Sequence, residues 1–291
     1  MSKYEINQNR PDWVRLFETI LTEPGKLGDH YSAFHNYSLG NQALAIEQMV
    51  ERAIPISPIA SFKSWKSKGR SVMKGQKAIA LWMPVTIKQK CTPQEVSSKG
   101  EPNEDGTSKM VFVMKNHWFA YSQTQEDPEA EAAQDDIEST TLQWDRDAAL
   151  ATLGIQLTPF ESVTGNSQGY AWPAMKLIAI NPVAAYPIKT TFHEMAHCLL
   201  HSKDEVQMVC GEDLSRNLKE AEAESVAFLC CAALSLDGLD LARGYVQNWL
   251  NDNESREAFK KSAGRVFSTA DKILKAGLST NVSMKPEEVT A

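Results

Sequence analysis

A strongly acidic segment near the middle of the chain places the firmest constraint on its fold. Residues 125–139 contain seven Asp or Glu residues and no Lys or Arg. Carboxylates without basic partners are costly to bury, so this run predicts a solvated linker. The length of 291 residues agrees with about two domains. We expect one domain at residues 1–124 with a flexible insertion at 92–109, an acidic linker at 125–141, and a second domain at 142–291.

The charge of the chain differs sharply between these parts. Residues 1–90 carry 13 basic and 7 acidic residues, a balance of +6, and residues 61–90 contain eight basic residues and no acidic one. Residues 91–140 carry 3 basic and 11 acidic residues, and residues 141–291 carry 14 and 19. The net charge of −7 therefore hides a basic N-terminal part. Such asymmetry indicates an anionic partner for that part.

Composition and cysteine content indicate the compartment. A hydrophobic fraction of 42% and a charged fraction of 23% exclude a globally disordered chain. We find neither an apolar signal segment nor a window of about 18 continuous apolar residues, so we expect no secretion and no membrane partner. The cysteine count of five is odd, and Cys198, Cys230 and Cys231 lie in apolar helical stretches. We expect a reduced, cytoplasmic protein.

The N-terminal part mixes helical and strand patterns. Apolar residues recur at helical spacing in residues 13–21 and again in residues 43–53. Residues 78–87 and 110–121 are apolar and β-prone, which predicts two strands, with Pro84 marking an edge or a bulge. These patterns predict an α+β domain.

Basic residues alternate with aromatic ones in this part of the chain. Lysines around Gly69 and Gly75 can meet phosphates while aromatic rings stack on bases, which suits single-stranded nucleic acid bound without sequence preference. The alternatives are a solvated basic loop, and aromatic residues such as Phe34 that only cover the two helices. The candidate DNA-binding residues are His35, Asn36, Tyr37, Asn41, Trp65, Lys66, Lys68, Arg70, Lys74 and Lys77.

The C-terminal part contains an H-E-x-x-H motif at residues 193–197. Positions four apart on a helix lie on one face, about 6 Å apart along the axis, so His193 and His197 can share one metal ion. Glu194 is then placed to take a proton from water. The flanking residues are apolar, and buried paired imidazoles need a partner such as a metal. The alternative is a hydrogen-bonded pair of core histidines.

A second helix offers the third ligand that a catalytic zinc ion usually needs. His201 lies about 12 Å from His193 along the helix axis, so we expect it at the surface or behind the ligands. Glu220 and Glu224 share one helical face, whereas Glu222 points away and could be solvated. We assign Glu220 as the third ligand and Glu224 as a carboxylate that orients a ligand histidine. The choice among the three glutamates stays open, as does an ordinary charged helix face.

Both parts of the chain resemble the ArdC-type antirestriction proteins. Residues 34–38 (FHNYS) and 69–79 (GRSVMKGQKAI) are similar to the N-terminal domain of that family. The motif at 193–197 and the helix with Glu220 and Glu224 resemble its zincin-like metallopeptidase domain, which is related to the ImmA/IrrE and SprT-like peptidases. The resemblance covers nearly the whole chain apart from residues 92–109 and the C-terminal tail. The extra carboxylate between Glu220 and Glu224 departs from the pattern.

The resemblance implies an α+β fold of two domains and a plasmid-encoded protein that binds single-stranded DNA. Such proteins protect incoming plasmid DNA from host restriction during conjugation. The family's pattern gives His193, His197 and Glu220 as metal ligands and Glu194 as general base. The expected ion is zinc (Zn²⁺), with Mn²⁺ or another divalent ion as the alternative.

Two functions follow from these features. The first is a zinc-dependent metalloprotease that acts on a DNA-bound protein, such as a subunit of a host restriction enzyme. The second is a non-catalytic protein that coats DNA or blocks restriction, with a structural or regulatory metal site. The complete H-E-x-x-H motif favours the enzyme, because a structural zinc site is closed by four ligands and does not need the glutamate.

Overall fold

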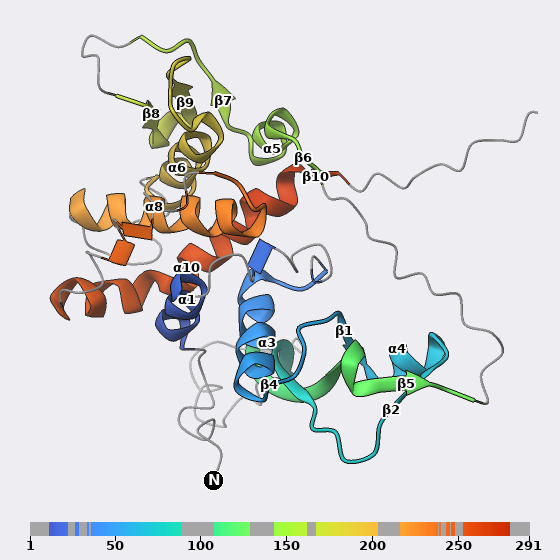
Figure 1. The fold of residues 1–291 in the computed structure, drawn as a ribbon. Helices are drawn as coiled ribbons and strands as arrows, with labels where there is room; N and C mark the ends of the chain where they lie inside the picture. The colour runs from blue at the N-terminus through green and yellow to red at the C-terminus, as the bar shows by residue number, and fades with distance from the viewer. Residues whose placement is uncertain are drawn as a thin grey trace, which may run out of the picture.

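The computed structural model describes residues 12–22, 27–28, 34, 36–88, 108–128, 143–161, 167–202, 216–237, 239, 243–244, 246–247 and 253–279. These residues form a mixed α+β fold, as expected, and Figure 1 gives the element labels. Most of the insertion predicted at 92–109, most of the linker predicted at 125–141, and His35 lie outside the described residues. The helices are α1 (Trp13–Thr22), α3 (Leu39–Glu51), α4 (Phe62–Ser67), α5 (Arg146–Leu153), α6 (Pro187–Leu200), α8 (Arg216–Ala233) and α10 (Asn253–Gly277).

The strands form small sheets at the two ends of the molecule. In the N-terminal part, the order is β1 (Ile59–Ser61), β4 (Ser108–Ala120), β3 (Ile79–Lys88), and β2 (Arg70–Val72) pairs with β5 (Thr124–Glu126). The two strands predicted at 78–87 and 110–121 are thereby confirmed, and β5 includes the first residues of the predicted linker. In the C-terminal part, the order is β7 (Gln156–Leu157), β9 (Leu177–Ile180), β8 (Gly169–Trp172), and β6 (Gln143–Trp144) pairs with β10 (Leu278–Ser279).

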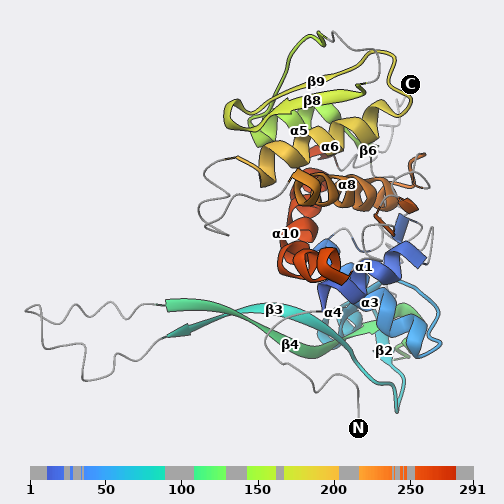
Figure 2. The same cartoon turned by 90° about the vertical axis from the view of Figure 1, so that its left-hand side faces the viewer.

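The elements stack in layers between these sheets. Figure 2 shows the sheet with β8 and β9, then α6, α8, α10 and α1 in turn, and finally α3 with the other sheet. The contacts of α6 with α8, of α8 with α10 and of α10 with α1 agree with this order. The β3–β4 hairpin extends away from the layers. None of the helices in the described ranges has the length and apolar composition that a bilayer span needs.

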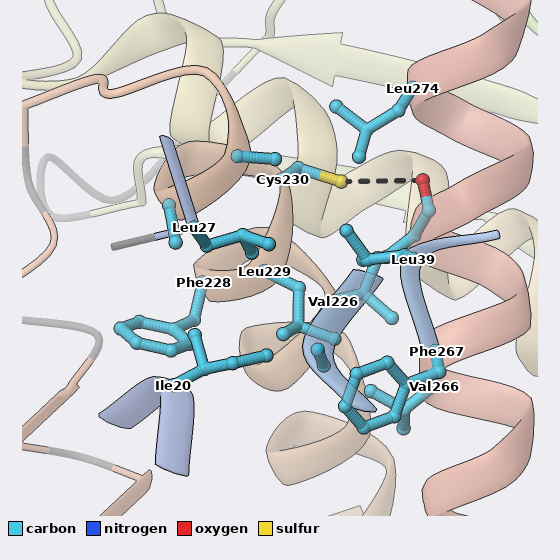
Figure 3. Packing of buried hydrophobic residues seen from close by; sticks show 14 of the residues in the cluster. Ile20, Leu27, Leu39, Val226, Phe228, Leu229, Cys230, Val266, Phe267 and Leu274 are labelled. Atoms are coloured by element: carbon cyan, nitrogen blue, oxygen red, sulfur yellow. Dashed lines mark hydrogen bonds between the residues drawn. The ribbon is translucent and has the colours of Figure 1, made fainter. Parts of the chain in front are cut away.

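Helices from both sides of the acidic segment share one hydrophobic core. Figure 3 shows Ile20, Leu27 and Leu39 packed with Phe228 of α8 and Phe267 of α10. All five side chains are at least 93% buried. Burying such a side chain contributes roughly 1.5–3 kcal/mol, so this shared cluster is a substantial interface. The α1 helix is therefore held against the C-terminal helices by packing as well as by the covalent chain.

Two side chains of α3 complete the hydrogen bonds of β3. The amide of Asn41 donates to the carbonyl of Trp82 (2.9 Å) and accepts from its N–H (2.9 Å). Gln48, two helical turns later, makes the same pair of bonds to Ala80 (2.8 and 2.9 Å). Buried backbone groups need such partners, so these two amides fix α3 on the outer edge of β3.

Trp13 fills a space that two glycines leave between α3 and α10. A Cβ atom at Gly40 would lie 2.3 Å from Cζ3 of Trp13, and one at Gly264 would lie 3.0 Å from its Nε1. The Trp13 ring also packs on Phe267, with ring centroids 5.2 Å apart. The absence of a side chain at these two glycines thus allows α1 to approach both helices closely.

We expect Gly40→Ala to destabilise the protein. The added methyl group must displace the Trp13 ring, and overpacking of this kind costs about 1–3 kcal/mol. Thermal unfolding followed by circular dichroism should show a melting temperature several degrees lower. The control is Gly244→Ala, where an added Cβ meets nothing within 4 Å. Equal melting temperatures for the two variants would show that Trp13 does not need this space.

Candidate metal centre

The α6 helix carries the H-E-x-x-H residues and is fixed by apolar packing. It begins at Pro187, whose missing N–H and fixed φ suit the first turn of a helix. Phe192, Met195 and Ala196 are fully buried, and the Phe192 ring meets Trp144 edge-on with centroids 4.6 Å apart. The helix contacts β8 and β9 as well as α8. This packing directs the two histidines towards α8.

Three potential ligand atoms converge between α6 and α8. The Nε2 atoms of His193 and His197 are 3.1 Å apart. Oε2 of Glu220 lies 3.4 Å from Nε2 of His193 and 3.7 Å from Nε2 of His197. Tetrahedral ligands bound at ~2.0–2.1 Å are ~3.3 Å from each other, so the three atoms fit around one ion. Among the described residues, these three form the group that could hold a metal ion.

The three glutamates of α8 have three different surroundings. Glu224 accepts a hydrogen bond from Nδ1 of His193 (3.1 Å) and pairs with Lys189 of α6 (2.6 Å). The expectation that Glu222 could be solvated is wrong, because its side chain is fully buried and pairs with Arg265 of α10 (2.9 Å). The helical spacing explains the result, since Glu220 and Glu224 face α6 while Glu222 faces α10.

Electrostatics in the centre favours a proton on His193 when no metal is bound. Burial lowers the pKa of His193, but hydrogen bonds to Glu220 and Glu224 and nearby carboxylate charges raise it to about 9. The same histidine contacts hold the pKa of Glu220 far below its ordinary value. A metal ion held by this group would therefore have to displace the proton of His193.

Glu194 lies in a confined space beside β8. Its side chain is 6% exposed, and burial raises its pKa, although the charges of His193 and His197 oppose this shift. A Cβ atom at Gly169 would lie 3.0 Å from Oε1 of Glu194. Glycine at this position therefore lets the β8 backbone pass close to the carboxylate. A carboxylate with a raised pKa is suited to accept a proton.

Trp65 and Arg70, both predicted to bind DNA, make hydrogen bonds within the protein. The indole of Trp65 is 3% exposed and donates to the carbonyl of Phe119 (2.8 Å). The guanidinium of Arg70 donates to Thr124 (2.8 Å) and lies 3.9 Å from the ring centroid of Tyr121. Both residues thus stabilise the loop that carries the basic residues.

The remaining candidates divide into internal and exposed residues. Asn41 is bonded to β3 as described above, and the hydroxyl of Tyr37 donates to the carbonyl of Ile59 (3.1 Å). Phe62, one of the aromatic residues that alternate with the basic ones, is 55% exposed at the start of α4. The candidates that the structure leaves exposed are Asn36, Lys66, Lys68, Lys74 and Lys77.

Comparison with known proteins agrees with this fold. Residues 5–125 match the N-terminal domain of anti-restriction factor ArdC. The metal-free crystal structure of antirestriction protein ArdC from plasmid R388 aligns with a TM-score of 0.50 and 20% identity, over 91% of this chain and 94% of that chain. Residues 5–125 thus correspond to an ArdC N-terminal domain, and the chain shares the fold of the R388 protein. The Mn(II)-bound structure of the R388 protein aligns with a TM-score of 0.49 and 18% identity, over 92% and 96%. No curated protein matches the chain.

Sequence patterns did not identify several residues of this centre. Lys189, Arg265 and Gly169 lie on three different elements. The fold brings them next to Glu224, Glu222 and Glu194, respectively. His201 was expected at the surface or behind the ligands, and its side chain is 3% exposed beside His197. The available signal of a buried partner was the position of Glu222 shortly before the apolar half of α8.

The affinity of this centre for a divalent ion such as Zn²⁺ should rise with pH. Below about pH 9 His193 holds a proton that the metal must displace, so the affinity should increase roughly tenfold per pH unit until that value is reached. Isothermal titration calorimetry in buffers of different ionisation enthalpy counts the released proton. Glu224→Gln should move this dependence to lower pH, because one carboxylate that raises the pKa is lost. An affinity that does not change with pH would contradict a protonated His193.

Proposed function

We propose that this chain is an ArdC-type antirestriction protein that binds single-stranded DNA without sequence preference and hydrolyses peptide bonds at a zinc centre. The observation that carries the proposal is the convergence of two imidazoles and Glu220 within 3.1–3.7 Å. Glu194, which directly follows His193, is buried beside the two histidines. A zinc site of three protein ligands keeps a coordination position for chemistry.

The residues around the centre have distinct tasks in this proposal. A bound divalent ion supplies Lewis acidity towards a water molecule and a peptide carbonyl. Glu194 accepts the proton of the attacking water at its carboxylate and can pass it to the leaving amine. In the described part of the sheet, β8 pairs only with β9, so its outer edge can add an extended peptide through backbone hydrogen bonds. Gly169 brings that edge close to Glu194.

The basic N-terminal part supplies the DNA surface in this proposal. Lys66 and Lys68 lie at the end of α4, and Lys74 and Lys77 lie in the turn between β2 and β3, all exposed. The exposed ring of Phe62 lies one turn before Lys66. Lysines that follow phosphates, together with a ring that stacks on bases, suit single strands of any sequence.

The shared core favours an action on proteins bound to the same DNA. Phe17 of α1 packs edge-on against Phe228 of α8, the helix that also carries Glu220, with centroids 5.8 Å apart. The DNA surface and the metal centre are thereby joined through packed helices. A restriction enzyme subunit on the bound DNA is the substrate that this arrangement suggests.

Replacing Glu194 with Ala tests the enzymatic step. The variant should keep its affinity for Zn²⁺ and for single-stranded DNA, while loss of a general base lowers hydrolysis by about 10²–10⁴-fold. Protection can be measured as the transfer of an unmodified plasmid into a restricting host, and Glu194→Ala should lose it. Glu47→Ala, which removes a carboxylate 6% exposed on α3, is the matched control. Full protection by Glu194→Ala would instead support the non-catalytic function with a structural or regulatory metal.

Removing four lysines tests the DNA surface. Combined alanine substitution of Lys66, Lys68, Lys74 and Lys77 should weaken binding to a labelled oligonucleotide. The slope of log K against log salt concentration should become shallower by up to about 0.7 for each lost phosphate contact. Fluorescence anisotropy at several salt concentrations measures both. The control removes four exposed lysines of α10, at 260, 261, 272 and 275. Equal losses in the two variants would place the DNA elsewhere.

A further inference from the structure

A buried line of polar side chains runs from His197 into the protein. Nδ1 of His197 lies 2.9 Å from Nδ1 of His201, and Nε2 of His201 lies 2.9 Å from Oε2 of Glu222. Oε1 of Glu222 lies 2.9 Å from Nη2 of Arg265. The side chains of His201 and Glu222 are 3% and 0% exposed, and that of Arg265 is 16% exposed. The line connects α6, α8 and α10 behind the metal centre.

The hydrogen bonds of this line allow one arrangement of protons when a metal is bound. A metal on Nε2 of His197 requires a lone pair there, so the ring proton lies on Nδ1. That N–H donates to Nδ1 of His201, which must then be an acceptor. The proton of His201 is therefore on Nε2, where it donates to the carboxylate of Glu222. Each bond fixes the next one.

We infer that His201 and Glu222 are positioning residues that fix the tautomer of His197 and thereby hold its Nε2 ready for the metal. The inference rests on the proposed metal centre and deepens it. The other ligand histidine is oriented by a different device, since Nδ1 of His193 donates directly to the carboxylate of Glu224. Nδ1 of His197 instead meets the ring of His201, which relays the effect of the Glu222 carboxylate to it.

Arg265 gives the carboxylate of Glu222 a fixed direction. Its guanidinium can only donate, so it needs an acceptor at Oε1 and leaves Oε2 for His201. The pair also compensates the charge of a fully buried carboxylate, which would be costly to bury alone. An ion pair that only stabilised the fold would be equally buried. The tautomer of His201 therefore distinguishes a positioning role of Glu222 from a purely structural one.

Nuclear magnetic resonance of the zinc-loaded full chain tests the relay directly. The chain has six histidines, and long-range ¹H–¹⁵N correlations in histidine-labelled protein distinguish the two tautomers of each ring. We expect His197 to carry its proton on Nδ1 and His201 on Nε2. A proton on Nδ1 of His201, or a doubly protonated His201, overturns the relay. Failure of the wild-type protein to bind Zn²⁺ overturns both the relay and the proposed function.

Substitutions at His201 test the effect on zinc affinity. His201→Phe keeps the ring volume and removes both hydrogen bonds, and loss of such an outer partner typically weakens metal binding about 10–100-fold. His201→Asn keeps an acceptor at the position of Nδ1, so it should recover much of the affinity. Competition with a chromophoric chelator measures the affinity. Zinc affinity of His201→Phe equal to that of the wild type overturns the relay and leaves the metal centre intact.

Glu222→Gln provides a sharper test, because it changes one acceptor into a donor. Arg265 must keep an acceptor, so the amide oxygen turns to Arg265 and the amide nitrogen donates to Nε2 of His201. His201 then carries its proton on Nδ1, and the metal-free variant should show this reversed tautomer together with zinc affinity lowered about 10–100-fold. Glu47→Gln is the matched control, because the carboxylate of Glu47 on α3 is buried and pairs with the partly exposed Arg15 of α1; this variant should change neither. An unreversed tautomer with unchanged affinity overturns the inference.

Discussion

The burial of two carboxylates of α8, those of Glu222 and Glu224, is the constraint on which the metal centre depends. A carboxylate removed from water costs several kcal/mol unless charged or hydrogen-bonding groups replace the water. Both buried glutamates have such a replacement, since Glu222 has Arg265 and His201, and Glu224 has Lys189 and His193. Glu220, whose side chain is 40% exposed, lies beside the two ligand imidazoles. The partners come from α6 and α10, so α8 can be buried only when it lies between these two helices.

The same helix connects the metal centre with the N-terminal part of the chain. Beyond the glutamates, α8 continues as an apolar segment that packs on α10 and on α1. The polar half of α8 thus sets the geometry of the ligands, and its apolar half sets the position of the N-terminal helix. A change in the packing of α1 would therefore be transmitted to α8 as a movement of the helix that holds Glu220.

Helical periodicity explains which parts of the centre could be predicted. The spacing of four between His193 and His197, and between Glu220 and Glu224, fixes which side chains share a face without knowledge of the partner helix. The burial of Glu222 could not be predicted, because it depends on Arg265 of α10, 43 residues away. Sequence patterns also could not distinguish the exposed Lys66 from the internally bonded Arg70.

The contact between the two parts of the chain could not be predicted from the sequence either. The acidic composition of residues 125–139 predicts a solvated connection, but composition says nothing about whether the segments on its two sides dock. That outcome depends on the shape of Trp13 and on the space at Gly40 and Gly264, which becomes visible only in three dimensions.

The amides of Asn41 and Gln48 have a consequence for how the molecule meets other chains. They occupy the backbone groups of Ala80 and Trp82 that an incoming strand would otherwise use, so a second molecule cannot extend the N-terminal sheet at that point. The edge of β8, in contrast, has no such amides from a neighbouring helix among the described residues. The amides of α3 thus close the N-terminal sheet to a further strand at that point of β3.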